Sequence, residues 1–187
     1  AELGYVAFAC DMYGEGRTSD TVPGAQALAG PFYGDRSLFR TRTQAGIDIL
    51  RAQPGVDPER IAAIGYCFGG TAVLELARSG ADIDGVVCFH GNLTTANPAD
   101  ARNIRCSVMV CNGADDAFVS MEDRQALIER MSKAGVDLQF IEYAGAVHSF
   151  TNPKADDLGM DSVGYDALSD RRSWAHMQLF FDEQFGD

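Results

Sequence analysis

Short apolar runs alternate with helix-like segments along this chain of 187 residues, and the alternation constrains its fold more than any other feature. The apolar runs occupy residues 5–10, 61–64, 85–89, 107–111 and 138–143. Helical patterns occupy residues 40–51, 71–78, 121–134 and 168–185. Continuous apolar runs of this length suit strands that are buried on both faces of a parallel sheet. The sequence therefore predicts an α/β fold, with a doubly wound, mostly parallel sheet and helices on both faces.

The organisation of the chain is predicted to be simple. It contains no internal repeat or low-complexity segment, and its length suits one domain, so residues 1–187 are interpreted as a single domain. Glycine and proline are frequent in residues 11–42. We interpret this stretch as irregular, with a lid-like segment around residues 14–42 and a helical turn near residues 25–29.

The sharpest motif is Gly65-Tyr66-Cys67-Phe68-Gly69-Gly70, which lies between a predicted strand and a predicted helix. It matches the nucleophile elbow G-x-S-x-G, with cysteine in the serine position. Glycines are expected there because side chains next to so tight a turn would collide with the neighbouring strand and helix. A sulfur at a helix N-terminus is favoured as a thiolate. The alternative is a glycine-rich turn that carries an inert, buried cysteine.

Two further candidates follow in the chain order nucleophile, acid, histidine. Asp115 and Asp116 come after the strand predicted at 107–111, and either could orient a histidine or cap the next turn. His148 follows the strand predicted at 138–143, where a general base is expected. By itself it could equally be a surface loop histidine. Because the carboxyl ends of parallel strands share one sheet edge, these side chains are expected to meet Cys67 there.

In combination these motifs resemble the dienelactone hydrolase family of the α/β-hydrolase fold. Residues 65–70 resemble its G-Y-C-x-G-G elbow, and residues 113–119 resemble its acid loop G-x-x-D-x-x-V, in which the acid aligns with Asp116. Residues 143–150 resemble the approach to its histidine, and residues 4–14 resemble a strand that leads to its D-x-Y-G turn. The resemblance covers essentially the whole chain.

The resemblance implies hydrolysis of an ester or lactone through a thioester, with a small molecule as substrate. Cys67 would attack the carbonyl, His148 would carry the proton, and Asp116 would hold His148. The backbone N–H of Phe68 would supply half of an oxyanion hole. No metal and no organic cofactor is implied.

The chain also departs from the family pattern. Members carry earlier strands, one of which supplies the second oxyanion donor and a cysteine-activating glutamate, so we expect the natural polypeptide to be longer at its N-terminal end. The arginines that bind the dienelactone carboxylate are replaced by Glu15 and Asn152. Dienelactone itself is therefore not the expected substrate.

Four residues are candidates for the wall of a substrate pocket, which is usually apolar with few polar groups: Tyr13, Tyr66, His90 and Phe118. Tyr13 could instead pack the lid-like segment onto the sheet. His90 follows the strand predicted at 85–89, and it could instead be a hydrogen-bonded structural histidine.

Charge and cysteine content exclude some partners and leave alternatives open. The net charge of -12 opposes binding to nucleic acid and to anionic membranes. Five cysteines with no CxxC motif suggest reduced thiols and a cytoplasmic location. Oligomeric state is not predicted. A thiol-based redox or sensing protein, or a non-catalytic binding protein on the same fold, remains the alternative to a hydrolase.

Overall fold

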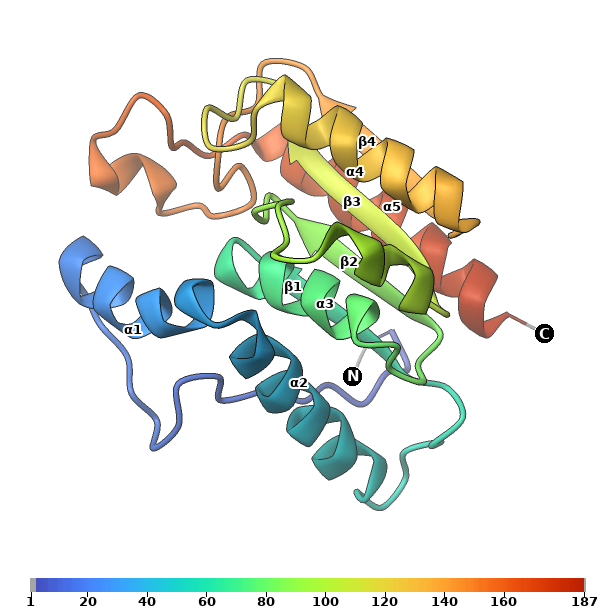
Figure 1. Ribbon diagram of the computed structural model, residues 1–187. Helices are drawn as coiled ribbons and strands as arrows, with labels where there is room; N and C mark the ends of the chain where they lie inside the picture. Colours follow the sequence, from blue (N-terminus) through green and yellow to red (C-terminus); the bar gives the residue numbers. More distant parts are fainter. Residues whose placement is uncertain (1–2, 187) are drawn as a thin grey trace. The chain divides into compact units, whose positions relative to one another are not determined.

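The computed structural model describes residues 3–186, and these fall into two compact units, the first ending at Ile61 and the second beginning at Ala62. The second unit contains a four-stranded sheet in the order β1-β2-β3-β4, with every neighbouring pair parallel (Figure 1). Its strands are β1 (Ala62–Tyr66), β2 (Gly85–Phe89), β3 (Ser107–Gly113) and β4 (Leu138–Tyr143). The predicted parallel sheet is confirmed.

Helices cover both faces of this sheet, as predicted. Helices α3 (Phe68–Arg78) and α4 (Met121–Ala134) lie on one face, and α5 (Ala167–Phe185) lies on the other (Figure 1). Two short 3-10 helices, η1 (Pro98–Asn103) and η2 (Ala155–Leu158), lie in the connections. Local signals set the helix ends: the Ser120 side chain caps the start of α4, and Gly135, at a φ of 73°, ends it.

The core lies around the two central strands. Every residue of β2 is buried, and β3 is buried from Val108 to Gly113. These strands carry continuous apolar side chains because both of their faces are covered by helices. Strand β1 differs from its prediction as a buried strand. It forms one edge of the sheet, and its side chains Ile64 and Tyr66 are exposed.

The sheet register aligns the carboxyl ends of the strands. Tyr66, the last residue of β1, pairs with Phe89 at the end of β2, and Phe89 pairs with Cys111 of β3. Gly113, the last residue of β3, pairs with Tyr143 at the end of β4. Residues that follow these strand ends are therefore delivered to one edge of the sheet.

The first unit corrects two predictions. Residues 5–10 form no strand, because within residues 3–186 no neighbouring strand supplies a hydrogen-bonding ladder for them. The stretch predicted to be irregular, residues 11–42, contains α1 (Val22–Gly34) and the start of α2 (Arg36–Arg51). The helix predicted at residues 40–51 is confirmed, and it begins four residues earlier than predicted. The side chains of Thr21 and Asp35 cap the first turns of these helices, which favours helix formation despite the glycines and prolines.

In the part of the chain that the structure describes, no helix is both long enough and apolar enough to span a bilayer.

Candidate active site

Cys67 occupies a strained turn between β1 and α3. Its φ is 52° and its ψ is -113°, a conformation that costs a non-glycine residue about 1–3 kcal/mol. Its backbone N–H donates to the carbonyl oxygen of Phe89 at 3.0 Å, which holds the turn against the end of β2. Strain of this kind persists only where the surrounding structure enforces it, and it is frequent at functional sites.

The glycines of the elbow differ in what they do. A Cβ on Gly65 would lie 2.0 Å from the backbone oxygen of Gly69, and one on Gly70 would lie 2.9 Å from the sulfur of Cys88. A Cβ on Gly69 would have no neighbouring atom within 4 Å. The steric role predicted for the glycines therefore applies to Gly65 and Gly70, and Gly69 has no such constraint.

The acid loop that follows β3 presents Asp116 rather than Asp115. Asp116 is only 2% exposed, and one of its carboxylate oxygens accepts a hydrogen bond from the backbone N–H of Phe118 at 2.9 Å. Its other oxygen, Oδ2, lies 2.9 Å from Nδ1 of His148. Asp115 is exposed. Of the two acids left open by the residues alone, Asp116 is the one that contacts the histidine.

His148 connects the acid to the cysteine. Its Nδ1 faces Asp116, and its Nε2 lies 3.2 Å from the sulfur of Cys67. Burial of the ring disfavours its charge, but the hydrogen bonds to Asp116 and Cys67, with the charges of both, outweigh burial and raise the pKa of His148 to about 9. The structure thus brings the three side chains predicted from sequence into one hydrogen-bonded chain.

Arg124 supports the acid loop and is not among the site residues predicted from sequence. It lies on α4 and donates to three main-chain oxygens of the loop, those of Ala114 at 3.0 Å, Asp116 at 3.3 Å and Val119 at 3.1 Å. It also pairs with Glu142 at 2.7 Å. A signal is present in the sequence, because Arg124 shares a buried helix face with Leu127 and Met131.

The four predicted pocket residues have different surroundings. Phe118 is 51% exposed, and its ring centroid lies 5.0 Å from that of His148. Tyr66 stacks on Phe89 at the end of β1. His90 is buried, and its ring lies edge-to-face against that of His148 at 5.2 Å. Tyr13 belongs to the first unit, where it contacts the ring of Phe32. A pocket role for each of them stays a prediction.

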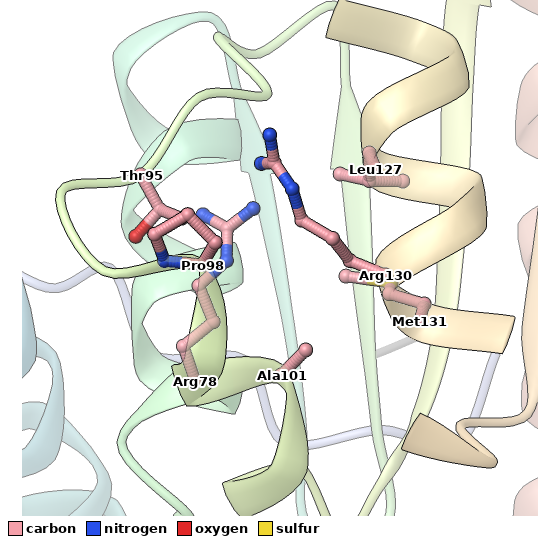
Figure 2. A pocket seen from close by; sticks show the side chains of 7 residues that line it. All are labelled: Arg78, Thr95, Pro98, Ala101, Leu127, Arg130 and Met131. Carbon is pink, nitrogen blue, oxygen red and sulfur yellow. The ribbon is translucent and has the colours of Figure 1, made fainter. Parts of the chain in front are cut away.

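A small cavity in the second unit lies elsewhere, between α3, η1 and α4 (Figure 2). It is lined by Arg78, Thr95, Pro98, Ala101, Leu127, Arg130 and Met131. None of these is a predicted site residue, so the cavity is not the predicted substrate pocket.

The sequence predicts no metal site. Among residues 3–186, no group of three or more His, Cys, Asp or Glu side chains is arranged to hold a metal ion.

Comparison with known proteins gives consistent matches. A model of the dienelactone hydrolase family matches residues 1–185. An uncharacterized protein of Caenorhabditis elegans is 35% identical over 150 residues, covering 79% of this chain and 94% of its own. The protein usf of Aquifex pyrophilus is 30% identical, covering 98% of this chain and 77% of its own. A solved dienelactone hydrolase-like promiscuous phosphotriesterase from metagenomic libraries is 44% identical with a TM-score of 0.93, over 99% of this chain and 77% of its own.

Proposed function

The chain belongs to the dienelactone hydrolase family, and from this premise we propose that it hydrolyses a carboxylic ester or a lactone through a thioester on Cys67. The single observation that carries the proposal is the unbroken hydrogen-bonded chain from Asp116 through His148 to the sulfur of Cys67. In this proposal Cys67, His148 and Asp116 are a catalytic triad. The strained φ of Cys67 and the burial of Asp116 support the assignment.

The proposed reaction has two steps. His148 takes the proton of the Cys67 thiol, and the sulfur forms a bond to the acyl carbon. The bond to the leaving oxygen then breaks, and the alcohol takes that proton from His148. His148 then removes a proton from water, which attacks the thioester, releases the acid and restores the thiol. The raised pKa of His148 suits a ring that must hold a proton beside the sulfur. Asp116 holds the ring and stabilises its charge.

In each step a negative charge develops on the carbonyl oxygen of the acyl group. We propose the backbone N–H of Phe68 as one donor to it, because Phe68 directly follows Cys67 and opens α3. The N-terminus of a helix favours a negative charge, and the loss of one such donor costs about 10²–10³-fold in kcat in a well-studied protease.

The proposed substrate is small. We propose that Phe118, which is exposed beside the ring of His148, contacts the substrate. Tyr66, His90 and Tyr13 are further candidates for contact with the substrate. Glu15 and Asn152 stand where the family's carboxylate-binding arginines lie. This favours a substrate that has no carboxylate at that place over dienelactone.

The high negative charge of the protein makes nucleic acid and anionic membranes poor partners. We also propose a cytoplasmic location, because none of the five cysteines, all within the described residues, forms a disulfide.

Phosphotriester cleavage is a second candidate activity. It rests on the 44% identity to the solved protein whose description names that activity. Hydrolysis of a phosphotriester with an aryl leaving group, by the wild type and by Cys67→Ala, would test whether the same sulfur attacks phosphorus.

The deciding experiment is hydrolysis of a short-chain aryl ester by the protein and by Cys67→Ala and Cys67→Ser, with mass spectrometry of the trapped acyl-enzyme. We expect Cys67→Ala to lose activity and the wild type to carry an acyl group on Cys67. Cys10→Ser is the matched control, since Cys10 and Cys67 are the two exposed cysteines. Hydrolysis that survives in Cys67→Ala would refute the proposal. Peroxide oxidation of Cys67 without acyl transfer would favour the redox alternative, and neither reaction would favour a binding protein.

A further inference from the structure

Backbone strain is concentrated at the edge of the sheet that carries the proposed triad. Among residues 3–186, four residues other than glycine have a positive φ: Glu15, Cys67, His90 and Ser149. One of them is the proposed nucleophile, and Ser149 adjoins His148. His90, at a φ of 39°, is the remaining one in the second unit, and it follows β2 directly. Strain of this kind persists only where the surrounding structure enforces it, so it points to a role for His90.

The main chain around His90 is hydrogen-bonded to β3 and to the turn at Cys67. The backbone N–H of His90 donates to the carbonyl oxygen of Cys111 at 2.9 Å. The preceding carbonyl, that of Phe89, accepts the N–H of Cys67 at 3.0 Å. His90 is therefore rigidly joined to the turn that presents the sulfur.

The side chain of His90 reaches the loop that carries His148. Its Nε2 forms a hydrogen bond with Oγ1 of Thr151 at 2.8 Å, and its ring packs edge-to-face on Phe150 at 5.3 Å. His90 is 2% exposed and Thr151 is half-buried, so the His90 end of this hydrogen bond is shielded from water.

The loop has a second attachment on its other side. The backbone N–H of His148 donates to the oxygen of Ser162, and the backbone oxygen of His148 accepts from Gly164 at 3.1 Å. These bonds hold the start of the loop, and the bond between His90 and Thr151 holds its next turn. The ring of His148 itself contacts the rings of His90 and Phe118.

The His90 ring is uncharged, which suits its position against the ring of His148. Burial, followed by the neighbouring charge of His148, lowers the pKa of His90 to about 3, although Asp116 acts in the opposite direction. The other titratable side chain in ring contact with His90 is Tyr66. His90 therefore stays neutral at neutral pH, and it places no positive charge against the protonated ring of His148.

We propose that His90 is a positioning residue, which through Thr151 holds the loop of residues 148–151 so that His148 contacts Cys67 and Asp116 together. This role rests on the proposed function, since it matters for catalysis only if His148 acts on Cys67. His90 acts through His148 and is not required to touch the substrate.

The test compares Thr151→Val, which removes the hydroxyl at nearly constant shape, with Thr151→Ser, which keeps it. We expect Thr151→Val to lower kcat for an aryl ester about 10- to 100-fold at nearly unchanged KM, because a small misplacement of a catalytic group is costly. Thr151→Ser should restore most of the activity. The NMR titration midpoint of His148 should fall in Thr151→Val, which a purely structural loss of stability would not cause.

A second variant guards against misfolding and tests the same link from the other side. His90→Asn tolerates a positive φ but is too short to reach Thr151. The double variant His90→Asn/Thr151→Val should titrate at His148 like His90→Asn alone, since both remove one hydrogen bond. An unchanged His148 midpoint in Thr151→Val and His90→Asn would overturn the proposal. The titration needs no turnover, so it stands even if the wild type proves to have no esterase activity.

Discussion

The guanidinium of Arg124 donates a hydrogen bond to the main-chain oxygen of Asp116 across 3.3 Å. Hydrogen bonds to charged groups contribute about 1.5–3 kcal/mol each at most sites. We therefore expect Arg124→Met to lower the free energy of unfolding by about 3 kcal/mol and to reduce kcat, because the loop that carries Asp116 loses its support. Urea unfolding and aryl ester hydrolysis measure the two effects.

Two further variants show whether the losses expected in Arg124→Met come from its ion pair or from its hydrogen bonds to main-chain oxygens. Glu142→Gln removes only the ion pair of Arg124, and because the Glu142 side chain is 41% exposed, it should cost less than about 1 kcal/mol. Arg124→Lys keeps the charge but lacks the planar fork that reaches several carbonyls, so it should fall between the wild type and Arg124→Met. A kcat at the wild-type level in Arg124→Met would show that the loop holds Asp116 without this side chain.

The elbow gives a matched pair of glycine substitutions. We expect Gly65→Ala to destabilise the protein by more than about 3 kcal/mol or to prevent its folding, because its Cβ would lie 2.0 Å from the backbone oxygen of Gly69. Gly69→Ala, in the first turn of α3 with open space around it, should be neutral or stabilising by up to about 1 kcal/mol. Thermal unfolding of both variants checks the difference. Equal stability of the two would contradict the geometry of the turn.

Sequence reasoning succeeds where the signal is local and fails where it is not. Cys67, Asp116 and His148 each follow a strand end, and the parallel register of the sheet brings such residues together. The contacts that join Arg124 to the acid loop are with main-chain oxygens, which no residue type reveals.

The formation of a strand or a helix also depends on contacts with other parts of the chain, which the local sequence does not show. Residues 5–10 have the composition of a strand, but a strand also requires a neighbour, which composition does not report. For α1 and α2, the capping residues Thr21 and Asp35 are visible in the sequence, yet the glycines and prolines between them favour an irregular segment. Which of two opposing local signals prevails is decided by the packing of the helices, and the sequence pattern does not show it.

The buried ion pair of α3 gives a prediction about stability alone. The side chains of Glu75 and Arg78 are 0% and 4% exposed and lie 3.0 Å apart. Glu75→Ala should cost about 3–5 kcal/mol in unfolding free energy, because it leaves a buried charge without its carboxylate. The exposed pair of Glu129 and Lys133 on α4 is the control, and Glu129→Ala should cost less than about 0.5 kcal/mol. Similar losses in both variants would refute the role of burial.

The titration of His148 tests the electrostatics of the proposed triad. The protein has three histidines, so their ring signals can be followed separately by NMR. We expect His148 to titrate near pH 9 and His90 to stay neutral down to about pH 3. Asp116→Asn removes the carboxylate that favours the charged ring, so the midpoint of His148 should move down towards about 6.5, and kcat should fall by up to about 10⁴-fold. A wild-type midpoint near 6.5 would contradict the contact with Asp116.

The same shift predicts how stability depends on pH. The pKa of His148 is about 9 in the folded protein and about 6.5 in the unfolded chain. The folded state binds the extra proton between these values, so the stabilisation is complete below about pH 6.5 and is lost as the pH rises through about 9. Urea unfolding of Cys67→Ala should show this decline at a smaller size, because the side chain of Cys67, which also raises the pKa of His148, is then absent. Adding Asp116→Asn should flatten it, because the remaining hydrogen bond that raises the pKa of His148 is then gone, and a decline of the same size in both variants would assign it to another group.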